Sequence, residues 1–78
     1  MSRARNDVLI ASFGAMLARA RRDAGMTQEQ LADLAEIDRT FVGLLETGRR
    51  QPTLSVLFAL ARGLDMSAED LLAQMKQR

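Results

Sequence analysis

Apolar residues recur at helical spacing along most of this chain. The first stripe predicts a helix that begins near Asp7 and ends before Gly25. An acid favours a helix N-terminus, and glycine readily adopts the left-handed conformation that ends a helix. The stripe consists of Leu9, Phe13, Met16, Leu17, Ala20 and Ala24. We expect these positions to face the core.

Two shorter helices follow. Thr27 and Gln30 have the spacing of a capping box, which predicts the start of the second helix. Asp38 is expected to cap the third helix, which should end near Gly48. The inward positions are Leu31, Leu34 and Ala35 in the second helix, and Val42 and Leu45 in the third.

Two further capped helices complete the pattern. Thr53 is expected to start the fourth, and Ser67 with Asp70 the fifth. The residues of the fourth helix that are expected to face the core are Leu54, Leu57, Leu60, Ala61 and Leu64. Those of the fifth helix that are expected to face the core or a partner are Leu71, Leu72 and Met75. Because the chain gives no strand signal, we predict a compact all-α domain of five helices over residues 7–78.

Composition narrows the classes of function. The 78 residues suffice for one small domain, and they include neither cysteine nor histidine. Disulfides and the usual nucleophile and general base are therefore excluded, and we expect no enzymatic activity, no metal and no cofactor. No apolar run approaches the ~18 residues of a membrane span, so we expect a cytoplasmic protein without membrane contact, associated with the nucleoid when bound to DNA.

The helix pair from Thr27 to Glu46 suggests DNA binding, because a helix–turn–helix uses its first helix to fix the second across the major groove. Residues 38–46 would be the recognition helix. Arg39 could donate two hydrogen bonds to a guanine, and Thr40 could contact a base with its hydroxyl or methyl group. Gly43 would allow close approach and Leu44 apolar contact.

The helix–turn–helix hypothesis also predicts contacts with the DNA backbone. Thr27, Gln28 and the free amides at the start of the second helix are placed to grip a phosphate, although Thr27 is equally explained as a cap. Arg49 and Arg50 would meet the backbone again, or form a solvated turn. Phe41 is either a core residue or a flanking contact with DNA.

Residues 1–6 lack apolar periodicity and are expected to form a flexible basic arm. Arg3 and Arg5 would belong to a solvated tail, as is common at chain termini, or to an arm that follows the DNA backbone or enters a minor groove. The net charge of +1 is weak evidence for either.

From Phe13 to Leu72 the chain resembles the Cro/C1-type (XRE) helix–turn–helix family, in the segments GMTQEQLA and LETGRRQP and in the final hydrophobic helix. The resemblance implies a lambda-repressor-like domain. The segment from Asp38 to Phe41 and the short length are most similar to the controller proteins of restriction–modification systems, which are small dimers that activate and repress transcription.

The resemblance also implies roles for single residues. Gln28 would contact phosphate, the bases would meet Arg39, Thr40, Phe41 and Leu44, and Arg49 or Arg50 would bind the backbone. Arg21 and Glu46 match an internal ion pair that joins the first helix to the end of the third. Gly43 and Leu44 depart from the family's frequent polar residues, so base readout would depend on Arg39, Thr40 and DNA shape.

The resemblance implies a dimer interface at Val56, Ala59, Leu72 and Met75. A dimer is also expected because one domain contacts too few bases, while a two-fold pair reads a pseudo-palindrome. Alternatively, these residues complete a small core. The sequence therefore supports a homodimeric transcriptional regulator of double-stranded DNA, compatible with an RNA polymerase contact. The second hypothesis is an antitoxin-like or adaptor module that binds a protein through the fourth and fifth helices.

Overall fold

The structure is a computed structural model that describes residues 3–75, and their side chains from Asp7 onwards. Its helices are α1 (Arg3–Asp23), α2 (Gln28–Ala35), α3 (Arg39–Glu46), α4 (Leu54–Gly63) and α5 (Ala68–Ala73). Over this described range there is no strand. The all-α, five-helix prediction is confirmed.

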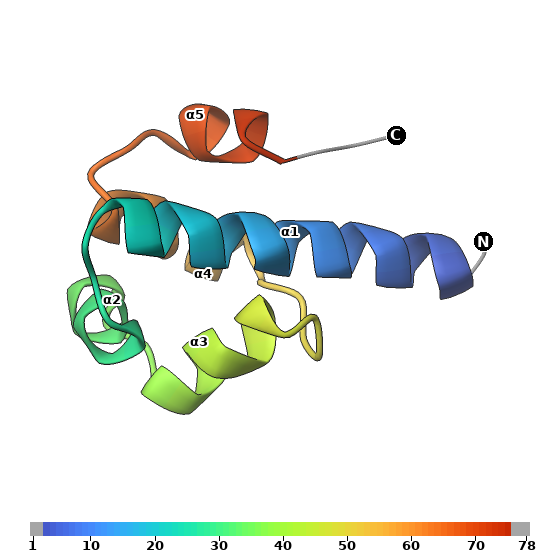
Figure 1. Ribbon diagram of the computed structural model, residues 1–78, viewed down its shortest axis with the longest axis horizontal. Coiled ribbons are helices and arrows are strands. Elements are labelled where there is room, and N and C mark those ends of the chain that lie inside the picture. Colours follow the sequence, from blue (N-terminus) through green and yellow to red (C-terminus); the bar gives the residue numbers. More distant parts are fainter. Residues whose placement is uncertain (1–2, 76–78) are drawn as a thin grey trace.

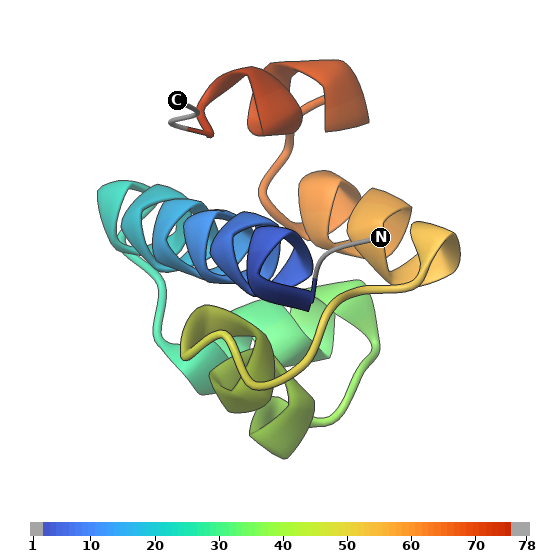
Figure 2. The ribbon, with the colours of Figure 1, turned by 90° about the vertical axis from the view of Figure 1, so that its right-hand side faces the viewer.

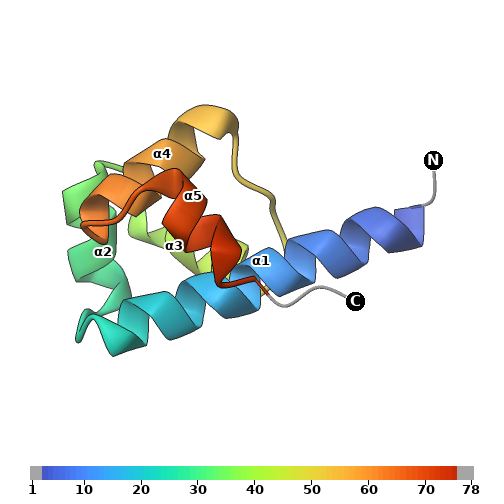
Figure 3. The same cartoon turned by 90° about the horizontal axis from the view of Figure 1, so that it is seen from above.

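The first helix is longer than expected. It begins at Arg3, four residues before Asp7, so the backbone of residues 3–6 is helical where an arm was predicted. The expectations for the Arg3 and Arg5 side chains lie outside the described residues. Figure 1 shows that the N-terminal turns of α1 extend beyond the other helices, and Figure 3 shows the same from above. No helix in the described part of the chain is long and apolar enough to cross a membrane.

Caps define the ends of the shorter helices. The Thr27 hydroxyl accepts from the Gln30 amide at 3.0 Å, and the Gln30 side chain accepts from the Thr27 amide at 2.8 Å, which completes the predicted capping box. The Thr53 hydroxyl accepts from the Val56 amide at the start of α4, and the Ser67 hydroxyl accepts from the Asp70 amide at the start of α5. Asp38 occupies the N-cap position of α3, but its side chain forms no capping hydrogen bond.

The turn between α2 and α3 contains a feature without a local sequence signal. Glu36 adopts the left-handed conformation, with φ of 60°, at the C-cap of α2. Glycine is the usual residue at such a position, because a Cβ atom disfavours it. The amide of Ile37 then donates to the Ala32 carbonyl and closes the turn.

The core lies where α1, α2, α3 and α4 meet, with α5 packed on α4 (Figure 2). It includes the predicted Phe13, Met16, Leu17, Leu31, Val42, Leu45, Leu60 and Leu71. Four residues that were predicted to lie in the core are instead exposed. Leu9 is 51% exposed, although it lines a hollow together with Leu57 and Leu72. Leu54, the first residue of α4, is 71% exposed. Leu34 is 53% exposed, although its Cβ lies beside Gly63 of α4, 3.3 Å from where a Cβ added to that glycine would be. Ala24 is also exposed, at the end of α1.

Close contact between α1 and α3 depends on Gly14. A Cβ added there would lie 2.3 Å from the Leu45 carbonyl oxygen and 2.8 Å from that of Glu46. Such distances are far inside van der Waals contact, so only glycine lets the two backbones approach in this way. The end of α3 is therefore fixed against the middle of α1.

Candidate nucleic-acid interface

Helix α3 has one buried and one accessible side. Val42 and Leu45 are fully buried and hold the helix in the core, as predicted. Arg39 and Thr40 are exposed in its first turn, and Gly43 and Leu44 follow at half-buried positions. The predicted readout residues thus lie on the accessible side, with Arg39 and Thr40 the most available.

A hydrogen-bonded network fixes this side of the domain to α1. Arg21 donates from Nε to Oε2 of Glu46 at 2.6 Å and from Nη2 to Oε1 at 3.1 Å, so the ion pair implied by the resemblance is present and bidentate. A third donor, Nη1, bonds the Met26 carbonyl at 2.8 Å. Both side chains are largely buried, with 12% of Arg21 and 5% of Glu46 exposed.

The network continues to the start of α3 through Gln28. Its Nε2 donates to Oε1 of Glu46 at 2.9 Å, and its Oε1 accepts from Nη1 of Arg39 at 3.2 Å. An amide can bridge the two because it carries both a donor and an acceptor. Gln28 was expected to contact a DNA phosphate. In the structure its side-chain amide also orients Arg39 through a hydrogen bond.

The ion pair affects the ionisation of Arg21. The hydrogen bond to Glu46 is the main cause that raises the pKa of Arg21, and burial opposes it. For a base with a raised pKa, the stabilisation is present below its ordinary pKa and is lost only as the pH rises through the folded value. The pair therefore stabilises the fold across the whole neutral range.

A hollow of about 470 Å³ lies between the starts of α2 and α3. It is lined by Arg21, Thr27, Gln28, Glu29 and Arg39. The Thr27 hydroxyl accepts a hydrogen bond from Gln30 and still has its own proton to donate. The first backbone amides of α2 also form no hydrogen bonds within the helix, as at every helix N-terminus. These donors suit an anionic oxygen such as a DNA phosphate.

The segment after α3 turns back on that helix. The Arg49 and Arg50 amides donate to the Leu44 carbonyl at 2.9 and 3.3 Å, so both side chains leave from the C-terminal end of α3. Gly48, with φ of 76°, makes the turn possible. Both arginines are exposed. Together with the hollow at the start of α2, they place the predicted backbone-binding groups on both sides of the predicted readout residues.

The remaining predicted residues have less accessible positions. Phe41 is half-buried and packs against the core, which favours its core alternative. Val56, Ala59 and Met75 also pack partly against the core, while Leu72 is 38% exposed. The more exposed apolar residues of this region, Leu54 and Phe58, were missed as surface candidates. Their spacing of four residues on one helix was the available signal.

Replacing Glu46 by alanine should lower the free energy of unfolding by about 2–4 kcal/mol, because it leaves the largely buried Arg21 without its counter-charge. Urea denaturation followed by circular dichroism measures this change. The exposed Glu29 provides the control, and its replacement by alanine should cost less than about 1 kcal/mol. Equal losses for the two variants would contradict the role of the ion pair.

These features define a helix-turn-helix protein, in which α2, with its capping box, supports α3 and its exposed Arg39 and Thr40. A family model described as a helix-turn-helix domain matches residues 12–75. The chain belongs to this family, which confirms the resemblance seen in the sequence.

Similar proteins agree with this assignment. The chain is 37% identical to an uncharacterized HTH-type transcriptional regulator, y4dJ, of Sinorhizobium fredii over 59 residues, which cover 76% of this chain and 77% of the relative. It is 41% identical to the control protein C.SmaI of Serratia marcescens over 49 residues, or 63% and 58% of the two chains. The crystal structure of the restriction-modification controller protein C.AhdI from Aeromonas hydrophila matches with a TM-score of 0.79 at 36% identity, over 82% of this chain and 97% of that one.

Proposed function

We propose that this protein is a sequence-specific DNA-binding transcriptional regulator that acts as a homodimer on pseudo-palindromic operators and controls its own operon. The observation that carries the proposal is the exposed Arg39, held by Gln28 at the start of a helix whose other side is fully buried. A rigid, pre-oriented guanidinium is well suited to bidentate recognition of guanine. The relatives named as transcriptional regulators and controller proteins support the same conclusion.

In this mechanism α3 enters the major groove with its first turn leading. Arg39 meets the O6 and N7 atoms of a guanine, and Thr40 contacts the neighbouring base. Gly43 lies one turn after Arg39. Even a Cβ added there would come no closer than 3.9 Å to the nearest atoms, which belong to the Gln28 amide, so the wall of the DNA groove can approach α3 closely at this position. Leu44 adds apolar contact at the edge of this surface.

Phosphate contacts on either side of α3 set its register in the groove. Thr27 and the first amides of α2 bind one phosphate, and Arg49 and Arg50 bind the backbone beyond the other end of the helix. Glu46 would repel a phosphate if it were free, but Arg21 neutralises it at 2.6 Å. Two such domains about a two-fold axis would read two half-sites, and a contact with RNA polymerase is compatible with regulation from that position.

Operator affinity is expected to fall roughly 10³- to 10⁵-fold between ~50 and ~200 mM salt if ~6–10 phosphates are neutralised by the dimer. Fluorescence anisotropy at a series of salt concentrations measures the slope of log affinity against log salt. Replacing both Arg49 and Arg50 by alanine should make that slope shallower, by about one for each phosphate that a domain no longer neutralises. Salt-independent binding to DNA would contradict the proposal.

A further inference from the structure

The centre of the accessible side of α3 carries no charged side chain. Gly43, Leu44 and Thr47 stand three, four and seven residues after Thr40, so the four positions share one side of the helix. Thr40 and Thr47 are exposed, and the two residues between them are half-buried. We call the surface formed by Thr40, Gly43, Leu44 and Thr47 the central α3 face.

Few hydrogen-bonding groups on the central α3 face are free to read a base. The Thr47 hydroxyl donates to the carbonyls of Gly43 and Leu44 at 2.9 and 3.3 Å, so its proton is used inside the helix. Gly43 has no side chain, and that of Leu44 is aliphatic. The Thr40 hydroxyl remains, and a hydroxyl both donates and accepts. It can therefore bond the O4 acceptor of thymine or the N4 donor of cytosine, and it does not tell these two bases apart.

The same face offers apolar surface that the core does not use. Leu44 is half-buried, but among the described residues of α3 it is Phe41, and not Leu44, that packs from such a position against the core. Gly43 leaves open space beside Leu44, because even an added Cβ would lie 3.9 Å from the Gln28 side chain. One turn earlier, Thr40 adds a methyl group. The face therefore combines aliphatic groups with room for a small group from the DNA.

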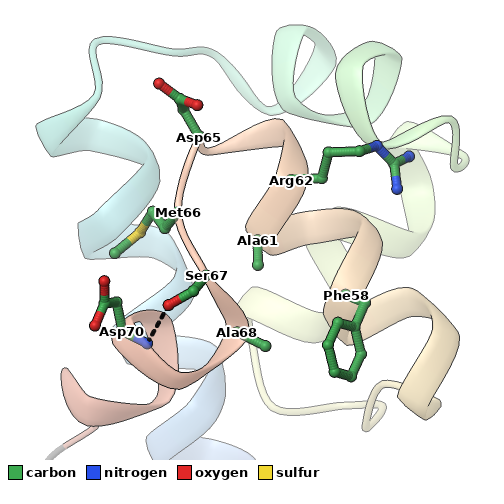
Figure 4. Close-up of a pocket in the computed structure, with 8 residues that line it drawn as sticks. All are labelled: Phe58, Ala61, Arg62, Asp65, Met66, Ser67, Ala68 and Asp70. Carbon is green, nitrogen blue, oxygen red and sulfur yellow. Dashed lines mark hydrogen bonds between the residues drawn. The ribbon is translucent and has the colours of Figure 1, made fainter.

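Charged side chains lie on other accessible surfaces of the domain. Figure 4 shows one of them, a hollow of about 550 Å³ between α4 and α5, which is lined by the exposed Arg62, Asp65 and Asp70. The accessible side of α2 likewise carries Glu29 and Asp33. An uncharged, aliphatic centre is thus a property of α3, the helix that would enter the major groove, and not of the whole surface.

We propose that the central α3 face reads the 5-methyl group of pyrimidines. This group is the apolar feature that thymine presents in the major groove. 5-Methylcytosine carries the same group at the same ring position. Because the polar groups of the face do not separate O4 from N4, the face should accept thymine and 5-methylcytosine alike and should disfavour uracil and unmethylated cytosine.

This assignment rests on the proposed function and divides base readout by α3 into two kinds of contact. Arg39 selects guanine through hydrogen bonds, and the residues that follow it select methyl groups through apolar contact. It also adds a property that the proposed function does not contain. Methylation of a cytosine that lies under the central α3 face should strengthen operator binding, so the protein would respond to the methylation state of its DNA.

Matched duplexes that differ by one methyl group test the proposal. In the operator selected from a random library, each position that pairs a pyrimidine within a half-site is filled in turn with thymine or uracil opposite adenine, and with 5-methylcytosine or cytosine opposite guanine. Fluorescence anisotropy measures the dissociation constants. At one position or more, the methylated member of both pairs should bind about fourfold more tightly, the effect of burying one methyl group. Equal binding within either pair at every position would overturn the proposal.

A pair of leucine variants assigns the effect to α3. Leu44→Ala removes the aliphatic contact, so its binding should lose most of the difference between the thymine and uracil duplexes. Leu34→Ala removes the same atoms from a leucine of α2 that is 53% exposed, and it should keep the difference shown by the parent. Circular dichroism checks the fold of both variants. A folded Leu44→Ala variant that keeps the full difference would overturn the role of the central α3 face.

Failure of this proposal is distinct from failure of the proposed function. A random library that yields no enriched sequence would contradict both, because there would be no operator to read. An enriched operator whose binding is indifferent to the 5-methyl group at every position would contradict methyl readout alone, and sequence-specific binding through Arg39 would stand.

Discussion

Replacing Gly14 by alanine is expected to lower the free energy of unfolding by about 3 kcal/mol or more. The added Cβ would lie 2.3 Å from the Leu45 carbonyl oxygen and 2.8 Å from that of Glu46. Both are backbone atoms of α3, so no side-chain rotation relieves the overlap, and α1 and α3 must separate. Because native proteins have only about 5–15 kcal/mol of stability in total, this change removes a large fraction of the stability of the domain.

Gly43→Ala is the matched control, because it adds the same atoms inside a helix at a position with room. The nearest atom to its Cβ would be Oε1 of Gln28 at 3.9 Å. Glycine in a helix costs about 1 kcal/mol relative to alanine, so this variant should be as stable as the parent or more stable. Urea denaturation of both variants makes the comparison. A Gly14→Ala variant as stable as the parent would contradict the account of how α3 is positioned.

Arg39→Ala is expected to reduce the preference for operator over random DNA by roughly 10- to 100-fold, because a bidentate contact to guanine contributes about 1–3 kcal/mol of discrimination. The fold should remain intact, since Arg39 is exposed and, among the described residues, its side chain bonds Gln28 alone. Competitive binding assays with operator and random duplexes measure the ratio directly.

Arg22→Ala separates base reading from general attraction to DNA. Arg22 is also exposed and carries the same charge, but it lies at the end of α1 rather than on α3. Its removal should weaken binding to all sequences equally and leave the ratio unchanged. If Arg39→Ala discriminates as well as Arg22→Ala, Arg39 has no part in readout.

Local features of the structure could be predicted from the sequence. Thr27, Thr53 and Ser67 cap the helices where their spacing indicated, because capping depends on residues within one turn. The buried pair Val42 and Leu45 followed from helical periodicity. The outward position of Arg39 on α3 followed from the same pattern.

Features that depend on distant segments could not be predicted. Periodicity identifies the apolar face of a helix but not where its neighbours end, so the exposure of Leu9 and Leu54 could not be predicted. Gly14 has no local signal for its contact with α3, since that helix is far along the chain. The amide of Gln28 bridges residues from two other parts of the fold, so its role in orienting Arg39 required the structure.

The central claim is that α3 reads a specific DNA sequence as part of a symmetric pair. Selection of bound duplexes from a fully random DNA library tests it most directly. We predict enrichment of two inverted half-sites about one helical turn apart, or roughly 10 bp between centres, with a guanine at the position where Arg39→Ala abolishes the base preference. A library that shows no enriched sequence after selection would contradict it.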